Sequence, residues 1–346
     1  MSFSFGFTSN DLNDDELTDD ETIAPTGSTQ TTNEFVNPLD FPRLLTQDVV
    51  QPQIIDLSLM LKSLNNVRLS FEQFSSPITS YPLYRRELFD VKHQLMLESD
   101  DPNVSNTNNE LTDILIGDTS EDLRKNVYEG GLKSWECSID LVDALNDTSY
   151  KELNQFNTFV ELGCGTSLPT EFIFSKLLLE STNQDITKTV ILSDYNESVL
   201  RLVSLPNLLI TWANCVLTAE QRVSLQRAQD ENVPICEDEL LLTEKLLDSF
   251  YQDMQKRNIN IHFISGSWGR TFTKLLHTII PADQNILVLT SETIYQPENL
   301  PVIAETLLDL KLSYSSIAVK EFVAAKDIYF GVGGSIVEFE NYLKRK

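Results

Sequence analysis

Cysteine and histidine are scarce in this sequence, which has four cysteines and three histidines among 346 residues. The cysteines show neither the paired spacing of a metal site nor a secretory context; they are Cys137, Cys164, Cys215 and Cys236. They are therefore predicted to be reduced thiols, as expected of a cytoplasmic and nuclear protein. The histidines show no clustering with other ligand types, so we expect no bound metal.

Basic residues are also in short supply. The sequence holds 26 lysines and arginines against 52 aspartates and glutamates, which gives a net charge of −26. A surface of this sign repels phosphates and argues against direct binding of nucleic acid. It suits a basic polypeptide as partner, although an acidic soluble protein without such a partner would have the same composition.

Long apolar runs and targeting signals are missing as well. No apolar run reaches the roughly twenty residues that cross a bilayer. The N-terminus lacks the basic region of a signal peptide. We therefore expect a protein that does not enter membranes.

The first 45 residues have the composition of a disordered tail. Seven acids lie between Asp11 and Glu21, and the first basic residue is Arg43. Such a segment buries too little apolar surface to offset the entropy lost on ordering. Residues 46–125 are predicted to form an N-terminal accessory region, and residues 126–346 the main domain.

The most informative stretch is Thr158–Pro169, which reads Thr-Phe-Val-Glu-Leu-Gly-Cys-Gly-Thr-Ser-Leu-Pro. Its apolar first half predicts a short buried strand that ends at Gly163, Cys164 and Gly165, and the spacing beyond Pro169 predicts a helix. A strand, a glycine turn and a helix begin a βαβ unit, in which the turn holds a nucleotide-like ligand. The sequence therefore predicts an α/β fold with a doubly wound, mostly parallel, Rossmann-like sheet.

The residues of this turn narrow the choice of ligand. A dinucleotide site would have a third glycine where Leu168 stands, and a phosphate-binding loop would end in Gly-Lys-Ser/Thr. Glu161, just before the turn, would repel a pyrophosphate but can pair with a cation. The turn therefore suits a cofactor that carries an ammonium and a sulfonium, with a plain tight turn as the alternative.

Asp194, followed by Tyr195 and Asn196, stands at the end of the next predicted strand, which begins at Thr189. A carboxylate at this place can accept hydrogen bonds from both hydroxyls of a ribose. We therefore predict that Asp194 binds ribose, with a simple turn aspartate as the alternative. The connection that follows is long for a crossover, so residues 200–256 are predicted to be a helical insertion.

The strand predicted at Ile259–Ile264 runs into Ser267 and Trp268. A polar loop and an indole at the end of a third strand can flank an adenine ring by stacking and by backbone hydrogen bonds. His262 lies inside this strand and is predicted to be packed rather than catalytic. The two loop residues are therefore assigned to the cofactor.

The fourth strand, predicted from Asn285, ends at Ser291, Glu292 and Tyr295. It runs beside the first strand in doubly wound sheets, so these residues should project over the reacting group of the cofactor. A buried carboxylate and a phenol can orient a nucleophile and accept its proton. We predict that Glu292 and Tyr295 are catalytic, with a strand-end cap as the alternative.

Several of these segments resemble a known family. The segments are Glu129–Cys137, Ser265–Trp268, Thr290–Tyr295 and Tyr329–Gly334, together with a Phe-x-Phe-x-Phe start, and they resemble the eukaryotic protein-histidine N-methyltransferase family. Val160–Gly165 looks like motif I of the seven-strand S-adenosylmethionine methyltransferases. Glu292-x-x-Tyr295 also matches the Asp/Glu-x-x-Tyr signature of the protein lysine methyltransferases of this fold.

The resemblance implies S-adenosyl-L-methionine as cofactor and a histidine of a large-subunit ribosomal protein as methyl acceptor, in a monomeric enzyme. The full set predicted to bind the cofactor is Ser134, Trp135, Glu136, Glu161, Gly163, Cys164, Gly165, Asp194, Tyr195, Asn196, Ser267, Trp268 and Ser291. A protein lysine methyltransferase is one alternative. A non-catalytic binding module or chaperone for a basic ribosomal protein is another.

The sequence departs from the family pattern at two places. Ser167 stands where motif I often has a third glycine, which puts the fine geometry of the turn in question. The chain stops at Lys346, where this fold normally continues into an antiparallel hairpin. We therefore expect the terminal hairpin to be missing, either because the natural chain is longer or because the sheet lacks two strands.

Overall fold

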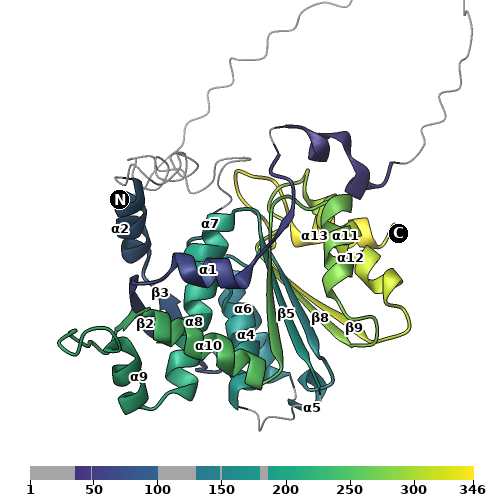
Figure 1. Ribbon diagram of the computed structural model, residues 1–346. Helices are drawn as coiled ribbons and strands as arrows, with labels where there is room; N and C mark the ends of the chain where they lie inside the picture. The colour runs from purple at the N-terminus through teal and green to yellow at the C-terminus, as the bar shows by residue number, and fades with distance from the viewer. Residues whose placement is uncertain (1–35, 48, 100–129, 149, 180–185) are drawn as a thin grey trace, which may run out of the picture. The chain divides into compact units, whose positions relative to one another are not determined.

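A computed structural model of the protein describes residues 36–47, 49–99, 130–148, 150–179 and 186–346. The acidic start of the predicted tail and residues 100–125 of the predicted accessory region lie outside the described residues. At the centre of the rest is a six-stranded sheet with strand order β1-β7-β5-β4-β8-β9 (Figure 1). Its strands are β1 (Gln53–Ile55), β4 (Thr158–Leu162), β5 (Lys188–Asp194), β7 (Ile259–Ser265), β8 (Ile286–Ser291) and β9 (Val319–Ala324).

The sheet is mostly parallel, as predicted. β1 runs antiparallel to β7, and every other pair of neighbouring strands is parallel. Among the described residues no strand pairs with the outer edge of β9, so the sheet shown here lacks the terminal hairpin. The doubly wound fold predicted from the glycine turn is therefore confirmed.

Both faces of the sheet are buried. Successive side chains of a strand point to opposite faces, so each strand contributes to two cores. Phe159, Val190 and Leu192 belong to one hydrophobic core, whereas Val160 and Ile191 belong to a second. A strand that is covered on both faces reads as a nearly continuous apolar run rather than an alternating one. This explains why the strands were visible in the sequence.

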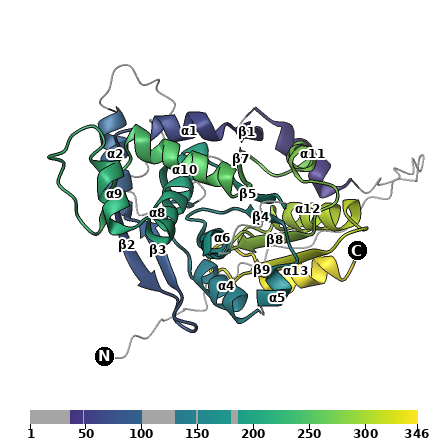
Figure 2. The same cartoon turned by 60° about the horizontal axis from the view of Figure 1, so that its bottom comes forward.

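Helices cover the two faces (Figures 1 and 2). One face carries α1 (Leu57–Ser63), α4 (Glu136–Asp147), α6 (Leu168–Leu179), α8 (Leu205–Val216) and α10 (Glu244–Lys256). The other carries α11 (Arg270–Ile279), α12 (Leu300–Ser313) and α13 (Ile336–Leu343). In the first layer the Trp212 and Phe250 rings pack edge to face with their centroids 5.5 Å apart, so α8 contacts α10.

The predicted tail ends earlier than its composition suggested. Residues 38–45 form two short 3-10 helices, η1 (Pro38–Asp40) and η2 (Pro42–Leu45). Leu39 and Leu44 are buried against Val302 of α12. The predicted boundary at residue 45 is therefore wrong, because a few apolar side chains suffice to hold an otherwise polar segment on the domain.

The accessory region and the insertion form one structural layer rather than two. A second sheet, in the order β3-β2-β6, combines strands from both of them. Its strands are β2 (Arg68–Ser75), β3 (Pro82–Arg86) and β6 (Glu239–Leu241). The insertion at 200–256 is therefore not purely helical, since its Leu240 pairs with Leu69 of the accessory region. The accessory region also contains α2 (Leu88–Ser99), and the insertion also contains α9 (Ala219–Gln226). A short helix, α5 (Tyr150–Leu153), precedes β4 of the central sheet.

One helix corrects the expectation that no segment is long enough to cross a membrane. Residues 197–216 form a continuous 20-residue helix of sufficient length and hydropathy. It comprises α7 (Glu197–Val199), the π-helical stretch η4 (Leu200–Ser204) and α8. Of its most apolar window, 78% is buried inside the protein. It is therefore a core helix, which explains its apolar composition without a membrane.

Candidate active site

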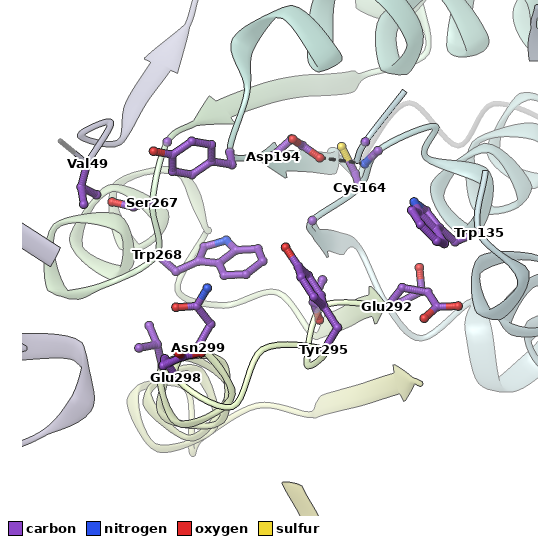
Figure 3. A pocket seen from close by; sticks show the side chains of 18 of the residues that line it. Val49, Trp135, Cys164, Asp194, Ser267, Trp268, Glu292, Tyr295, Glu298 and Asn299 are labelled. Atoms are coloured by element: carbon purple, nitrogen blue, oxygen red, sulfur yellow. Dashed lines mark hydrogen bonds between the residues drawn. The ribbon is translucent and has the colours of Figure 1, made fainter. Parts of the chain in front are cut away.

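A cavity of about 350 Å³ opens at the carboxyl ends of the parallel strands (Figure 3). This edge is where doubly wound folds bind their ligands, because the turns after the strands meet there. The predicted residues that line the cavity are Trp135, Gly163, Cys164, Gly165, Asp194, Tyr195, Ser267, Trp268, Ser291, Glu292 and Tyr295. The structure thus brings both predicted catalytic residues and most of the predicted cofactor residues into one space.

Four predicted cofactor residues lie outside the lining of the cavity. The hydroxyl of Ser134 pairs with that of Thr166. Glu136 is exposed and pairs with Lys326 at 2.6 Å. The remaining two are Glu161, which is buried behind the glycine turn, and Asn196. Neighbours of a binding residue in sequence share its loop but point elsewhere, so these four assignments are not supported by the geometry.

The glycine turn is shaped by its contact with Trp268. Gly163 has φ +64°, in the left-handed region that favours glycine. A Cβ atom at this position would lie 2.5 Å from Cγ2 of Thr293 and 3.3 Å from the Trp268 ring. The missing side chain therefore lets the indole pack directly on the turn, in addition to giving a ligand access to the backbone.

Ser167 occupies the position at which motif I often has glycine. It keeps the backbone that glycine would favour, with φ +56°. Its N–H donates to the carbonyl of Cys164 at 2.6 Å, and its own carbonyl accepts the N–H of Glu171 at 2.7 Å. Two backbone hydrogen bonds thus hold this strained serine at the start of α6, and the turn geometry is preserved despite the substitution.

Glu161 acts on the turn from behind. Its Oε2 atom accepts the backbone N–H of Thr170 at 2.9 Å, in the first turn of α6. Burial, with a smaller contribution from the negative charge of Asp194, raises the pKa of Glu161 to about 8. In the ligand-free protein the side chain therefore favours its protonated form and caps the first turn of α6.

We expect Glu161→Gln to stabilise the protein more at high pH than at low pH. The folded-state pKa of about 8 lies above the ordinary value of 4.5. Wild-type stability should therefore fall as the pH rises between these values, because the unfolded chain releases a proton that the folded protein keeps. Glutamine avoids this loss while keeping an acceptor for Thr170. Melting temperatures of wild type, Glu161→Gln and the exposed control Glu231→Gln at pH 6 and pH 9 check this. If Glu161→Gln raised the melting temperature by the same amount at both pH values, this prediction would be contradicted.

Asp194 is held rigidly at the wall of the cavity. Its Oδ2 atom accepts the N–H of Gly165 at 3.0 Å, shown by the dashed line in Figure 3. Its Oδ1 atom accepts the N–H of Asn196 at 3.1 Å. Two backbone donors therefore fix the carboxylate at the junction of β4 and β5, where it faces the cavity.

Glu292 lies on the other side of the cavity, between Tyr295 and Trp135 in Figure 3. It has φ +57°, a costly backbone for a residue with a side chain. Its Oε1 atom accepts the N–H of Cys137 at 3.3 Å. Strain at this position, balanced by such contacts, is typical of functional sites.

Two neutral groups have raised pKa values near the carboxylate of Glu292. Burial and the proximity of this carboxylate raise the pKa of Tyr329 well above its usual range. Burial and the same carboxylate raise the pKa of Cys137 to about 12. Both groups therefore stay protonated at neutral pH. Tyr329 was quoted in the family resemblance but not in the predicted site, because nothing in the sequence shows that it folds back onto β8.

Tyr295 separates the two halves of the cavity. In Figure 3 it stands between Trp268 and Glu292. Its ring packs edge to face against that of Tyr329, with the two ring centroids 6.3 Å apart. Its carbonyl accepts the N–H of Gly334 at 2.9 Å. The phenol of Tyr295 is thus supported from behind by the segment that follows β9.

The N-terminal segment, residues 36–52, closes one wall that the sequence did not predict. Arg43, Leu44, Thr46 and Val49 line the cavity. The Arg43 guanidinium donates to the side-chain oxygen of Asn299 at 3.2 Å. Further along the segment, the Val50 carbonyl accepts the N–H of Ser267 at 2.9 Å. No motif marks these residues, since their roles come from contacts with distant parts of the chain.

Other lining residues also escaped prediction. They are Gly131, Lys133, Ser138, Thr166, Gly266, Thr293, Glu298, Asn299 and Val302. Most adjoin a predicted residue in sequence, so a wider window around each motif would have included them. Glu298, Asn299 and Val302 are different, because they come from the start of α12 and carry no recognisable signal.

The fold and this site define a class of protein. A glycine turn after β4, an acid at the end of β5 and a carboxylate–phenol pair after β8 surround one cavity in a mostly parallel sheet. This is the arrangement of a methyltransferase with a Rossmann-like fold. No protein-family model matches the chain.

Curated relatives identify the family. The chain is 57% identical over 348 residues to histidine protein methyltransferase 1 of Saccharomyces cerevisiae, which covers 100% of this chain and 91% of that protein. It is 36% identical over 278 residues to the Schizosaccharomyces pombe protein of the same name, covering 80% of this chain and 73% of that protein. A Rattus norvegicus homologue is 30% identical over 226 residues, covering 65% and 52%. The chain therefore belongs to the histidine protein methyltransferase 1 family, and it is a protein-histidine methyltransferase.

Proposed function

We propose that the protein transfers the methyl group of S-adenosyl-L-methionine to an imidazole nitrogen of a histidine in a large-subunit ribosomal protein. The observation that carries this proposal is the single cavity that joins Asp194 and Trp268 at one end to Tyr295 and Glu292 at the other. One end suits a nucleoside, and the other suits a methyl acceptor.

The residues at the first end fit the proposed cofactor. Asp194 presents a fixed carboxylate to which ribose hydroxyls can donate. The Nε1 atom of Trp268 is buried and has no hydrogen-bond partner among the described residues. A bound nucleoside would supply the missing acceptor, which removes the cost of burying an unpaired N–H. The N-terminal segment completes this end with Leu44 and Val49 and shields it from water.

The residues at the second end fit a histidine acceptor. When bound, the cofactor supplies an electrophilic methyl group on a positively charged sulfur. The attacking nitrogen of the imidazole must be unprotonated and aligned with that methyl group. In this proposal Glu292 accepts the N–H of the other ring nitrogen and so fixes the tautomer, while Tyr295 positions the ring. The N–H of Cys137 donates to Glu292 and helps to hold it in place for this task.

The proposed partner follows from charge and from the family resemblance. A chain with a net charge of −26 attracts a basic polypeptide, and ribosomal proteins are basic. The enzyme is proposed to act as a monomer in the cytoplasm and nucleus, on free ribosomal protein rather than on nucleic acid. The four cysteines are all free thiols in the structure, as expected in such compartments.

Incubation with methyl-labelled S-adenosylmethionine and an extract of ribosomal proteins tests this function. We expect label on one large-subunit protein, and mass spectrometry should locate it on a histidine. Glu292→Ala serves as a slowed control, in which the initial rate of labelling should be lower. Label on a lysine would support the alternative methyltransferase class, and cofactor binding without any transfer would support the binding module.

A further inference from the structure

A turn beside the active site exposes an apolar surface. The turn connects β9 to α13 and comprises residues 326–334, here called the rim loop. Within it the exposed fractions are 55% for Ile328, 90% for Phe330 and 42% for Val332. Tyr329, between the first two, is half-buried, and its ring meets that of the catalytic-site residue Tyr295. The rim loop therefore has an inner side that belongs to the catalytic site and an outer side that is apolar.

The rim loop is held in one conformation by its own backbone. The carbonyl of Tyr329 accepts the N–H groups of Val332 and Gly333, at 3.3 and 3.0 Å. The carbonyl of Gly334 accepts the N–H of Tyr329 at 3.0 Å, and the N–H of Gly334 donates to the carbonyl of Tyr295 at 2.9 Å. A preformed surface loses little conformational entropy when a partner binds.

Two glycines of the rim loop, Gly331 and Gly334, differ in how closely their backbone approaches the rest of the protein. A Cβ atom on Gly334 would lie 2.2 Å from the carbonyl oxygen of Ile294, so the backbone passes directly against the end of β8. A Cβ atom on Gly331, next to Phe330, would meet nothing within 4 Å. One end of the rim loop is thus packed onto the catalytic strand, while its tip stands in open space.

The outer side of the loop is unusual for a free surface. Single exposed apolar residues are common on soluble proteins, but grouped ones mark contact sites. Here three lie within five residues, and Val337 in the first turn of α13 is a fourth, 57% exposed. The exposed acids Asp327 and Glu338 flank them. This combination favours a partner that is both apolar and basic.

We propose that the rim loop is the docking surface for the polypeptide segment flanking the target histidine, with Phe330 as its anchor; this inference rests on the proposed function. The connection to the site is direct, because the Tyr329 ring in the same loop contacts the Tyr295 ring and the N–H of Gly334 donates to the carbonyl of Tyr295. A histidine presented to Glu292 brings its neighbouring residues to this rim. The partner segment is expected to carry an apolar side chain near the histidine and basic residues beside it.

Docking at this surface predicts an effect on substrate affinity without an effect on the chemical step. Phe330→Ser removes the anchor but leaves Tyr329 and its contact with the Tyr295 ring in place. We expect the KM for the protein acceptor to rise about threefold to tenfold, as for an aromatic anchor at the edge of an interface. The kcat value and the affinity for S-adenosylhomocysteine should stay the same.

The experiment compares wild type, Phe330→Ser, Ile328→Ser and a matched control. The control is Phe89→Ser, since Phe89 is 79% exposed on α2, in the layer formed by the accessory region. Initial rates are measured against rising concentrations of the large-subunit ribosomal protein that wild type labels. The rim-loop variants should raise KM, and the control should not.

Three outcomes would overturn the inference. The first is an unchanged KM in both rim-loop variants while wild type methylates the ribosomal protein, which leaves the proposed function intact. The second is a lower melting temperature of Phe330→Ser than of Phe89→Ser, which would mean that another part of the chain covers the surface. The third is a change in oligomeric state, which would make it an interface between copies. A wild type that labels no ribosomal protein would instead overturn the proposed function.

Discussion

Replacing Glu292 with alanine is expected to lower turnover by about tenfold to a hundredfold, because one orienting hydrogen bond to a charged group is lost. Glu292→Gln should fall between wild type and alanine, since glutamine keeps an acceptor oxygen but loses the charge that strengthens the bond. It also keeps an acceptor for the N–H of Cys137. Affinity for the cofactor should be nearly unchanged in both variants, because Glu292 lies away from Asp194 and Trp268 (Figure 3).

The measurement for Glu292 is kcat at saturating substrates, with calorimetric binding of S-adenosylhomocysteine alongside. Glu231→Ala, an exposed glutamate in the insertion, is the matched control. An alanine variant that binds the cofactor poorly yet turns over normally at saturation would place Glu292 in the cofactor shell instead. The assignment of Glu292 as a catalytic residue would then be wrong.

The pH profile of turnover gives a second reading of the same site. The acceptor imidazole must be neutral, so the rate should rise through a pKa near 6.5, the approximate ordinary value for histidine. Cys137 and Tyr329 do not titrate in this range, because their pKa values are raised by burial and by Glu292. A rate that keeps climbing well above pH 8 would instead indicate a lysine acceptor.

Asp194→Ala is expected to weaken cofactor binding by about 1.5–3 kcal/mol, or roughly tenfold to a hundredfold in Kd. The carboxylate is the proposed acceptor for the ribose hydroxyls. It also orders the glycine turn through the N–H groups of Gly165 and Asn196, and alanine would leave both without this partner. Asp194→Asn keeps part of each role and should lose less.

Calorimetric titration with S-adenosylhomocysteine measures the effect of Asp194. Asp248→Ala, an exposed aspartate on α10, is the control. Melting temperatures of the unliganded proteins separate a loosened turn from a lost ligand contact. Unchanged affinity in a folded Asp194→Ala protein would remove this residue from the cofactor site.

The sheet and the centre of the site could be predicted because both depend on local pattern. Strands buried on two faces appear as apolar runs, and a polar residue directly after such a run stands at the ligand-binding edge. Asp194 and Glu292 were found by this rule, Trp268 and Tyr295 were found in the loops that follow such strands, and all four line the cavity. Family resemblance then supplied the chemistry, which spacing alone leaves open.

The rest could not be predicted, because it depends on side-chain direction or on distant contacts. Glu161 was assigned to the cofactor from its place beside the glycines, yet its side chain points back to the N-terminus of α6. Arg43 closes the cavity by bonding to Asn299, which lies 256 residues away in the chain. A pattern within a short window contains no information on either point.

The N-terminal segment also affects how the chain acquires its active form during synthesis. Residues 36–52 leave the ribosome early, but their partners do so late: the Val50 carbonyl accepts the N–H of Ser267 after β7, and Arg43 bonds to Asn299 just before α12. The segment must therefore wait, unpaired, while most of the domain is made. Contacts of such long sequence separation slow folding, because a large loop must close before they form. The cofactor pocket should consequently be among the last parts of a nascent chain to mature, and a chain arrested before α12 should bind no cofactor even with its glycine turn complete.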